Sequence, residues 1–236
     1  MFNLLKVELY KLKKFKFGHI AVLFMLVMGL LYGGYHIGYQ LSYLEENTAT
    51  IFFDVVSDTS FVFVISLVAA LFIGKDFSNH TICNEIKLGY NRFHILLSRM
   101  IVACAFAVLL HTIYVISTVL GFSVVRGFDT RVLCVENALW LFTVLIQLVA
   151  VISGVVMISF LAKKVSGAIS VSVMYAFICC NILRNFISSK IFTMSCFCFV
   201  QDNDIENLLF AAISAFVTMI IFSVIATFTF NKADVK

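Results

Sequence analysis

The sequence lacks proline altogether, and charged residues make up only 13% of its 236 residues. Soluble domains average about 25% charged and about 45–50% apolar residues, whereas 62% of this chain is hydrophobic and its mean hydropathy is +1.04. The composition therefore excludes an ordinary soluble domain and predicts an integral membrane protein. The missing proline also removes a common cause of sharp helix kinks.

Sequence motifs for nucleotide binding and hydrolysis are also missing. Gly74 and Lys75 lack the earlier glycine and the following Ser or Thr of a P-loop, and neither HExxH nor GxSxG occurs. No C-x-x-C pair is present, which argues against a zinc or thioredoxin-like site. We therefore expect no catalytic residue, no metal and no cofactor bound by this chain.

Six of the seven cysteines fall into two groups. Cys104, Cys179 and Cys180 lie in apolar runs and are predicted to be small core residues. Cys134, Cys196 and Cys198 lie in two loops on the same predicted side of the membrane, where a disulfide and free thiols both remain open.

Long apolar runs predict an all-α, polytopic membrane protein with six transmembrane helices in one transmembrane domain, residues 1–236. The second run is the least sharply bounded, because Asp54 and Asp58 interrupt the apolar residues before it. The predicted spans are residues 18–41, 59–73, 93–122, 139–162, 165–187 and 208–230.

Basic residues gather in alternate segments between these spans. If the N-terminus is cytoplasmic, 13 of the 17 lysine and arginine residues lie on the cytoplasmic side. The positive-inside rule therefore predicts cytoplasmic N- and C-termini. The 13 are Lys6, Lys11, Lys13, Lys14, Lys16, Lys75, Lys87, Arg92, Arg99, Lys163, Lys164, Lys232 and Lys236.

Residues 1–17 combine five lysines with apolar residues at helical spacing, namely Phe2, Leu5, Leu9 and Leu12. This pattern predicts an amphipathic helix in the membrane interface, with its lysines toward anionic headgroups. The alternative is a basic tail that only sets topology. In the first span, Gly29 and Gly33, and likewise Gly34 and Gly38, are spaced for close helix packing or dimerisation.

The longest polar interruption, residues 75–99, reads KDFSNHTICNEIKLGYNRFHILLSR. Residues 81–88 are predicted to form a helix of about two turns, with Ser78 or Asn79 ahead of it as N-cap residues. Gly89 suits the left-handed position that ends a helix, and Asn91 suits the N-cap of the next. So short a helix needs something to dock against, and an ordinary loop is the alternative.

This stretch resembles the cytoplasmic coupling loop of type-2 ATP-binding-cassette (ABC) exporter permeases, in particular the small six-span permeases of peptide export, lantibiotic immunity and phenol-soluble-modulin transport. His80 stands where those permeases usually carry glycine, and Cys83 where they carry a basic residue. Histidine tolerates positive φ, so the backbone can survive the first change. The matching residues are Phe77, Ser78, Asn79, Thr81, Ile82, Asn84, Glu85, Ile86, Gly89, Tyr90, Arg92, Ile95, Leu97, Ser98 and Arg99.

The resemblance implies a permease subunit without a nucleotide site of its own. A separate ABC ATPase would bind ATP and Mg²⁺, and two permeases, identical or paralogous, would assemble with two ATPases. Residues 75–92 would form the coupling loop, and 188–207 a re-entrant outer segment. The residues expected to couple to the ATPase are Thr81, Ile82, Asn84, Glu85, Ile86, Gly89, Tyr90 and Arg92.

The same resemblance points to amphipathic or antimicrobial peptides as substrates, and to a multi-pass protein of a bacterial plasma membrane. The lipid bilayer is the other expected partner, and no nucleic acid is expected. A drug or lipid efflux permease is the alternative. A stand-alone intramembrane enzyme or ion-coupled carrier would need ionisable residues at matched depth. Its candidates, His36, His111 and Asp58, share no spacing rule and are interpreted as interhelical hydrogen-bonding groups.

Overall fold

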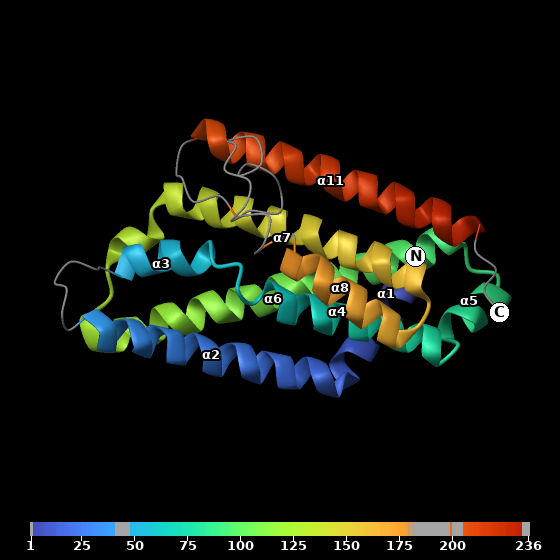
Figure 1. Ribbon diagram of the computed structural model, residues 1–236, viewed down its shortest axis with the longest axis horizontal. Coiled ribbons are helices and arrows are strands. Elements are labelled where there is room, and N and C mark those ends of the chain that lie inside the picture. The colour runs from blue at the N-terminus through green and yellow to red at the C-terminus, as the bar shows by residue number, and fades with distance from the viewer. Residues whose placement is uncertain (1, 41–47, 179, 181–198, 200–204, 233–236) are drawn as a thin grey trace.

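The computed structural model describes residues 2–40, 48–178, 180, 199 and 205–232, and these form a helical bundle without a strand among them (Figure 1). The predicted all-α class is therefore confirmed. The elements are α1 (Phe2–Lys14), α2 (Lys16–Gln40), α3 (Thr48–Val56), α4 (Val62–Ser78), α5 (Thr81–Lys87), α6 (Arg92–Arg126), a 3₁₀ turn (Thr130–Leu133), α7 (Val135–Ala162), α8 (Val165–Phe177) and α11 (Ile205–Lys232).

The long helices lie side by side along one axis (Figure 1). α2 packs along α6, α11 along α7, and α4 along α8. One end of the bundle, which we call the α5 end, carries α1, α5, the turn between α7 and α8, and the C-terminal end of α11 (Figure 1). The opposite, α3 end carries α3 and the start of α7. The segments predicted to be cytoplasmic thus gather at the α5 end.

Among the described residues, four helices are long and apolar enough to cross a membrane, namely α2, α6, α7 and α11. α4 and α5 pass the same test together but are bent by 56°, and α8 is a shorter apolar helix as far as it is described. Six spans and cytoplasmic termini stay predictions. Most of the predicted re-entrant segment, 188–207, lies outside the described residues.

The helix is interrupted at residues 57–61, between α3 and α4, across the start of the second predicted span, 59–73. Asp58 organises the break, because its carboxylate accepts the backbone N–H of Ser60 at 2.8 Å and the hydroxyl of Tyr114 on α6 at 3.0 Å. A polar side chain that satisfies local backbone groups competes with the helix, so the chain breaks here without a proline. Asp58 thus has the interhelical hydrogen bond expected of it.

The glycines of the first span join α2 to α6 within the same chain. A Cβ on Gly29 would meet Ser117 and the carbonyl of Tyr114, and one on Gly33 would come within 2.6 Å of the carbonyl of Thr118. A Cβ on Gly34 would meet nothing within 4 Å among the described residues. Gly29 and Gly33 therefore form an intramolecular packing seam. The side chains around Gly38 are not described, and a dimer role for these glycines stays a prediction.

Candidate functional site

The turn between α4 and α5 forms by a route that the sequence pattern only half predicts. Ser78 ends α4 and Asn79 is the C-cap of α4. The prediction that one of these side chains caps α5 is therefore wrong. The residue ahead of α5 is His80, which adopts a left-handed conformation with φ of 54°. His80 therefore takes the backbone conformation that the resemblance associates with glycine at this position.

The end of α5 follows the sequence prediction closely. Gly89 has φ of 85°, its N–H bonds the carbonyl of Ile86 at 3.0 Å, and the N–H of Tyr90 bonds the carbonyl of Glu85 at 3.2 Å. These two bonds make a Schellman motif, which satisfies the last carbonyls of a helix. Asn91 then caps α6 by accepting the N–H of Phe93 at 3.0 Å, as predicted.

The inner face of α5 is anchored by Glu85 and Ile82. Arg99 of α6 binds the Glu85 carboxylate with both terminal nitrogens, at 2.9 and 3.1 Å, and Ile82 is fully buried. A two-turn helix is marginal in water. A bidentate arginine contact fixes both the orientation and the position of the carboxylate. α5 is therefore held rigidly against α6 at the end of the bundle.

Arg99 is also the centre of a larger group of buried charges, which we call the ionic cluster: Glu8, Lys11, Asp76, Glu85 and Arg99. The Arg99 Nε donates to Asp76 of α4 at 2.8 Å, and its Nη2 lies 3.4 Å from Glu8 of α1. Lys11 of α1 lies 2.8 Å from Glu8 and 3.2 Å from Asp76. The cluster thus joins α1, α4, α5 and α6 at one point.

The charges of the cluster do not balance, because three carboxylates share two cations. One oxygen of Glu8, Oε2, is buried without a hydrogen-bond partner among the described residues. Burial raises the pKa of the Glu8 carboxyl above its ordinary value of 4.5, although Arg99 and Lys11 pull the pKa down. A proton on Glu8 would make the cluster formally neutral.

The cluster also identifies the face of α1 that packs against the rest of the protein, and the interfacial position of α1 stays a prediction. Phe2 and Leu9 of the expected apolar stripe are exposed, at 80% and 55%, whereas Leu4 and Glu8 are buried. Phe15, just after α1, is buried as well. The face of α1 that meets the protein is therefore built around a carboxylate, because Glu8 finds Arg99 and Lys11 there.

The outer face of the α5 hairpin is open. Asn84, Lys87, Leu88 and Tyr90 are exposed, Leu88 to 77% and Tyr90 to 39%. Thr81 and Ile86 are partly buried, and Ile86 packs against the core. An exposed leucine beside an exposed tyrosine at a polar tip is a suitable surface for another protein.

Arg92, the first residue of α6, contacts the C-terminal helix. Its Nη1 donates to the carbonyls of Phe230 and Asn231 at 2.9 Å each, near the end of α11. These carbonyls are among those that a helix leaves without internal partners, and an arginine is a favourable cap for them. Arg92 thus ties the exit of the α5 hairpin to the end of α11.

The residues considered for intramembrane chemistry are not shown to form a site. His111 is buried with its ring 6.0 Å from that of Phe199, and its Nε2 has no partner among the described residues. The side chain of His36 lies outside the described part. Of the other sequence candidates, Cys104 and Cys180 are buried as predicted and Cys134 is a free, exposed thiol, whereas Cys196 and Cys198 are not described.

Comparison with known proteins decides the family. The model of a family described as ABC-2 family transporter protein matches residues 4–179, well over half of the chain. The chain belongs to the ABC-2 transporter family. The matched region includes the whole ionic cluster and α5. Comparison with curated proteins and with solved structures returns no match.

Membership in the ABC-2 family makes the chain a multi-pass membrane subunit of an ABC transporter. A subunit of this kind works with an ABC ATPase and is not itself the enzyme. The resemblance drawn from residues 75–99 is confirmed at this level. The sequence motif contained Glu85 and Arg99, but nothing in the pattern signalled that Glu8, Lys11 and Asp76 would join them.

Proposed function

We propose that this chain is the permease of an ATP-driven exporter and that α5 is the helix through which a separate ATPase acts on it. The proposal is carried by the difference between the two faces of α5. Its inner face is held to α6 by the contact of Glu85 with Arg99 and buries Ile82, and its outer face is open. A push on α5 would therefore reach α6 through Arg99, α4 through Asp76 and α1 through Lys11 and Glu8.

The burial of Glu85 refines the expected docking contacts. Glu85 was expected to contact the ATPase directly, a role that stays a prediction, but its carboxylate is engaged by Arg99. We assign the docking contacts to Asn84, Lys87, Leu88 and Tyr90, and give Glu85 and Arg92 positioning roles. The missing P-loop supports an ATP site on a partner, and two permeases with two ATPases make the proposed working unit.

The docking assignment is tested with Leu88→Glu in cells that also make the partner ATPase. Leu88 is largely exposed, so the variant folds, but a charge inside the interface should lower ATPase copurification about tenfold. Phe128→Glu is the matched control, because Phe128 is 52% exposed in the loop that follows α6 at the α3 end. Wild-type copurification of Leu88→Glu would refute the assignment of α5 as the docking helix.

We further propose amphipathic peptides, of the phenol-soluble-modulin or lantibiotic kind, as the substrates, and the bacterial plasma membrane as the location. A groove of about 410 Å³ between α6 and α11 supports this, because Met100, Met219 and Phe93 line it with soft apolar groups. Such surfaces accept varied apolar faces, and amphipathic peptides reach a permease from the membrane interface.

Cationic and amphipathic peptides should change ATP hydrolysis by the reconstituted complex. Stimulation by a drug or a lipid alone would favour the alternative efflux function.

A further inference from the structure

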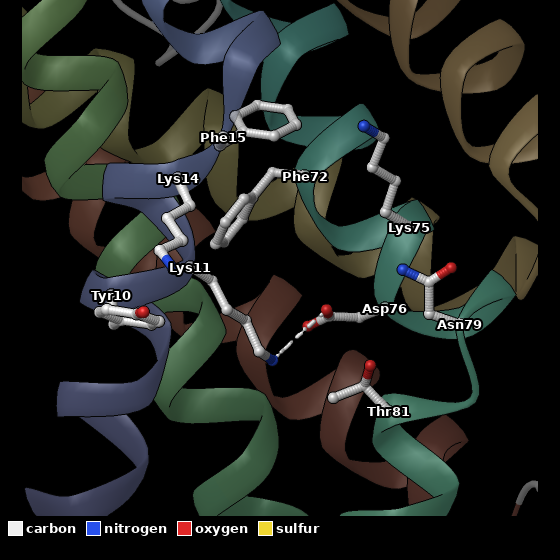
Figure 2. Close-up of a pocket in the computed structure, with 9 residues that line it drawn as sticks. All are labelled: Tyr10, Lys11, Lys14, Phe15, Phe72, Lys75, Asp76, Asn79 and Thr81. Atoms are coloured by element: carbon white, nitrogen blue, oxygen red, sulfur yellow. Dashed lines mark hydrogen bonds and ion pairs between the residues drawn. The ribbon is translucent and has the colours of Figure 1, made fainter.

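A cavity of about 290 Å³ lies between α1 and α4 at the α5 end (Figure 2). It shares Lys11 and Asp76 with the ionic cluster, but its other lining residues have no part in the coupling route proposed above. The other lining residues that matter here are Lys14, Phe15, Phe72, Lys75, Asn79 and Thr81.

The lining carries an excess of positive charge. Lys11 is neutralised by Glu8 and Asp76, but no ion pair of Lys14 or Lys75 occurs within the part of the chain that the structure describes. The Lys14 Nζ lies 4.7 Å from the Tyr10 ring centroid, and the Lys75 Nζ lies 4.5 Å from that of Phe17. Aromatic faces hold these ammonium groups in place without cancelling their charge. The cavity therefore has two positioned cations, whereas the carboxylate in its lining, Asp76, is already bound by Lys11 and Arg99.

The rest of the lining divides into an apolar part and a polar part. Phe15 and Phe72 are buried and meet edge to face at 5.5 Å, and Figure 2 shows Lys14 and Lys75 on opposite sides of this ring pair. Asn79 and Thr81 lie below Lys75 and add an amide and a hydroxyl, both of which can donate hydrogen bonds. Cations, donors and an apolar wall within one small cavity match a phosphate group that carries an apolar body.

The position of the cavity agrees with this chemistry. It lies where polar α1 gives way to apolar α2, which is the level of the lipid headgroups if α2 spans the membrane. The leaflet at the predicted cytoplasmic side of such a membrane carries anionic lipids that attract clustered lysines. We propose that this cavity binds the phosphate of an anionic phospholipid headgroup, attracted by the positive charge of Lys14 and Lys75.

The test uses the full-length protein purified in detergent, with phosphatidylglycerol and phosphatidylcholine as the two probes and native mass spectrometry as the readout. The wild type should retain phosphatidylglycerol in preference to phosphatidylcholine. Lys14→Gln/Lys75→Gln should lower that retention at least about tenfold, because both ammonium contacts are lost. Lys6→Gln/Lys13→Gln is the matched control, since it removes the same charge from exposed lysines outside the cavity.

A second variant separates occupancy of the cavity from charge. Asn79→Trp keeps both lysines but fills the space from an exposed position, and it should lower phosphatidylglycerol retention as well. Asn79→Trp still tests whether the lipid occupies the cavity if the double lysine variant fails to fold. Equal retention by wild type and Asn79→Trp, or an equal loss in the Lys6/Lys13 control, would overturn the proposal.

The source of the phosphate is tested in parallel by thermal unfolding. Phosphatidylglycerol should raise the unfolding temperature of the wild type but not that of Lys14→Gln/Lys75→Gln, and millimolar inorganic phosphate should raise neither. Equal protection of the wild type by inorganic phosphate would show a site for the free ion, and the lipid assignment would be wrong.

Discussion

Arg99 is fully buried in α6, and it contacts carboxylates from three other helices. A buried ion pair is a poor net stabiliser compared with apolar packing, but removal of one partner leaves the other charges buried and uncompensated. Loss of Arg99 should therefore destabilise the protein mainly because its carboxylate partners would stay buried without their cation.

Arg99→Gln should lower the free energy of unfolding by about 3–5 kcal/mol, because Asp76 and Glu85 would lose their main cation. Arg99→Lys should fall between this variant and the wild type, since it keeps the charge but not the bidentate geometry. Arg92→Gln is the control, because this partly buried arginine donates to two backbone carbonyls, and its loss should cost about 1–2 kcal/mol. Denaturant or thermal unfolding in detergent measures all three. Equal stability of Arg99→Gln and Arg92→Gln would contradict the central role of Arg99.

Glu8 should make stability depend on pH in a definite direction. Since burial raises its pKa in the folded protein, folding favours the protonated carboxyl. This contribution is fully present below the ordinary value of 4.5 and is lost as the pH rises through the raised pKa. Glu8→Gln mimics the protonated form, so its unfolding temperature relative to the wild type should increase as the pH is raised above 4.5. A difference that stays constant or shrinks with pH would count against a raised pKa.

At the scale of elements, the contact of α2 with α6 depends on the absence of side chains at two positions. Gly33→Ala should destabilise the protein by about 1–3 kcal/mol, because its Cβ would lie 2.6 Å from the backbone carbonyl of Thr118. Gly34→Ala is an adjacent control whose Cβ meets nothing within 4 Å in the described part of the chain, and it should be neutral or slightly stabilising, since alanine favours helix. Thermal unfolding compares the two, and similar values would rule out the packing seam.

The ends of the helices around α5 were predictable because local chemistry decides them. Gly89 and Asn91 act as the sequence predicts, since a left-handed glycine and an asparagine N-cap need only their immediate neighbours. The break at Asp58 was less predictable. The sequence shows an acid beside a span, but the break is stabilised by Tyr114, which comes from another helix.

The ionic cluster could not be predicted for the same reason. Its members come from α1, α4, α5 and α6, and no periodic pattern relates them. The positive-inside rule assigned Lys11 and Arg99 to the cytoplasmic side. That rule counts every lysine and arginine alike and says nothing about the partner of each one. Their individual partners depend on how the helices pack, and a single sequence carries no direct record of that.

At the scale of the whole molecule, the two ends of the bundle should face opposite sides of the membrane. Cys83 lies on α5 and Cys134 lies just before α7, at the α3 end (Figure 1). With each as the single cysteine of the chain, a membrane-impermeant thiol reagent should label Cys134 in intact cells. Cys83 should react only after the membrane is opened. Labelling of Cys83 in intact cells would reverse the predicted orientation.

The ionic cluster also limits how this sequence can change during evolution. A lineage that loses Arg99 is left with three buried carboxylates facing one lysine, so Asp76 or Glu85 must be replaced at nearly the same time. Replacement of Glu8 by a neutral residue is the mildest single step, because one of its oxygens already lacks a partner among the described residues. Positions 8, 11, 76, 85 and 99 should therefore covary in an alignment of relatives, with position 8 changing first and position 99 last.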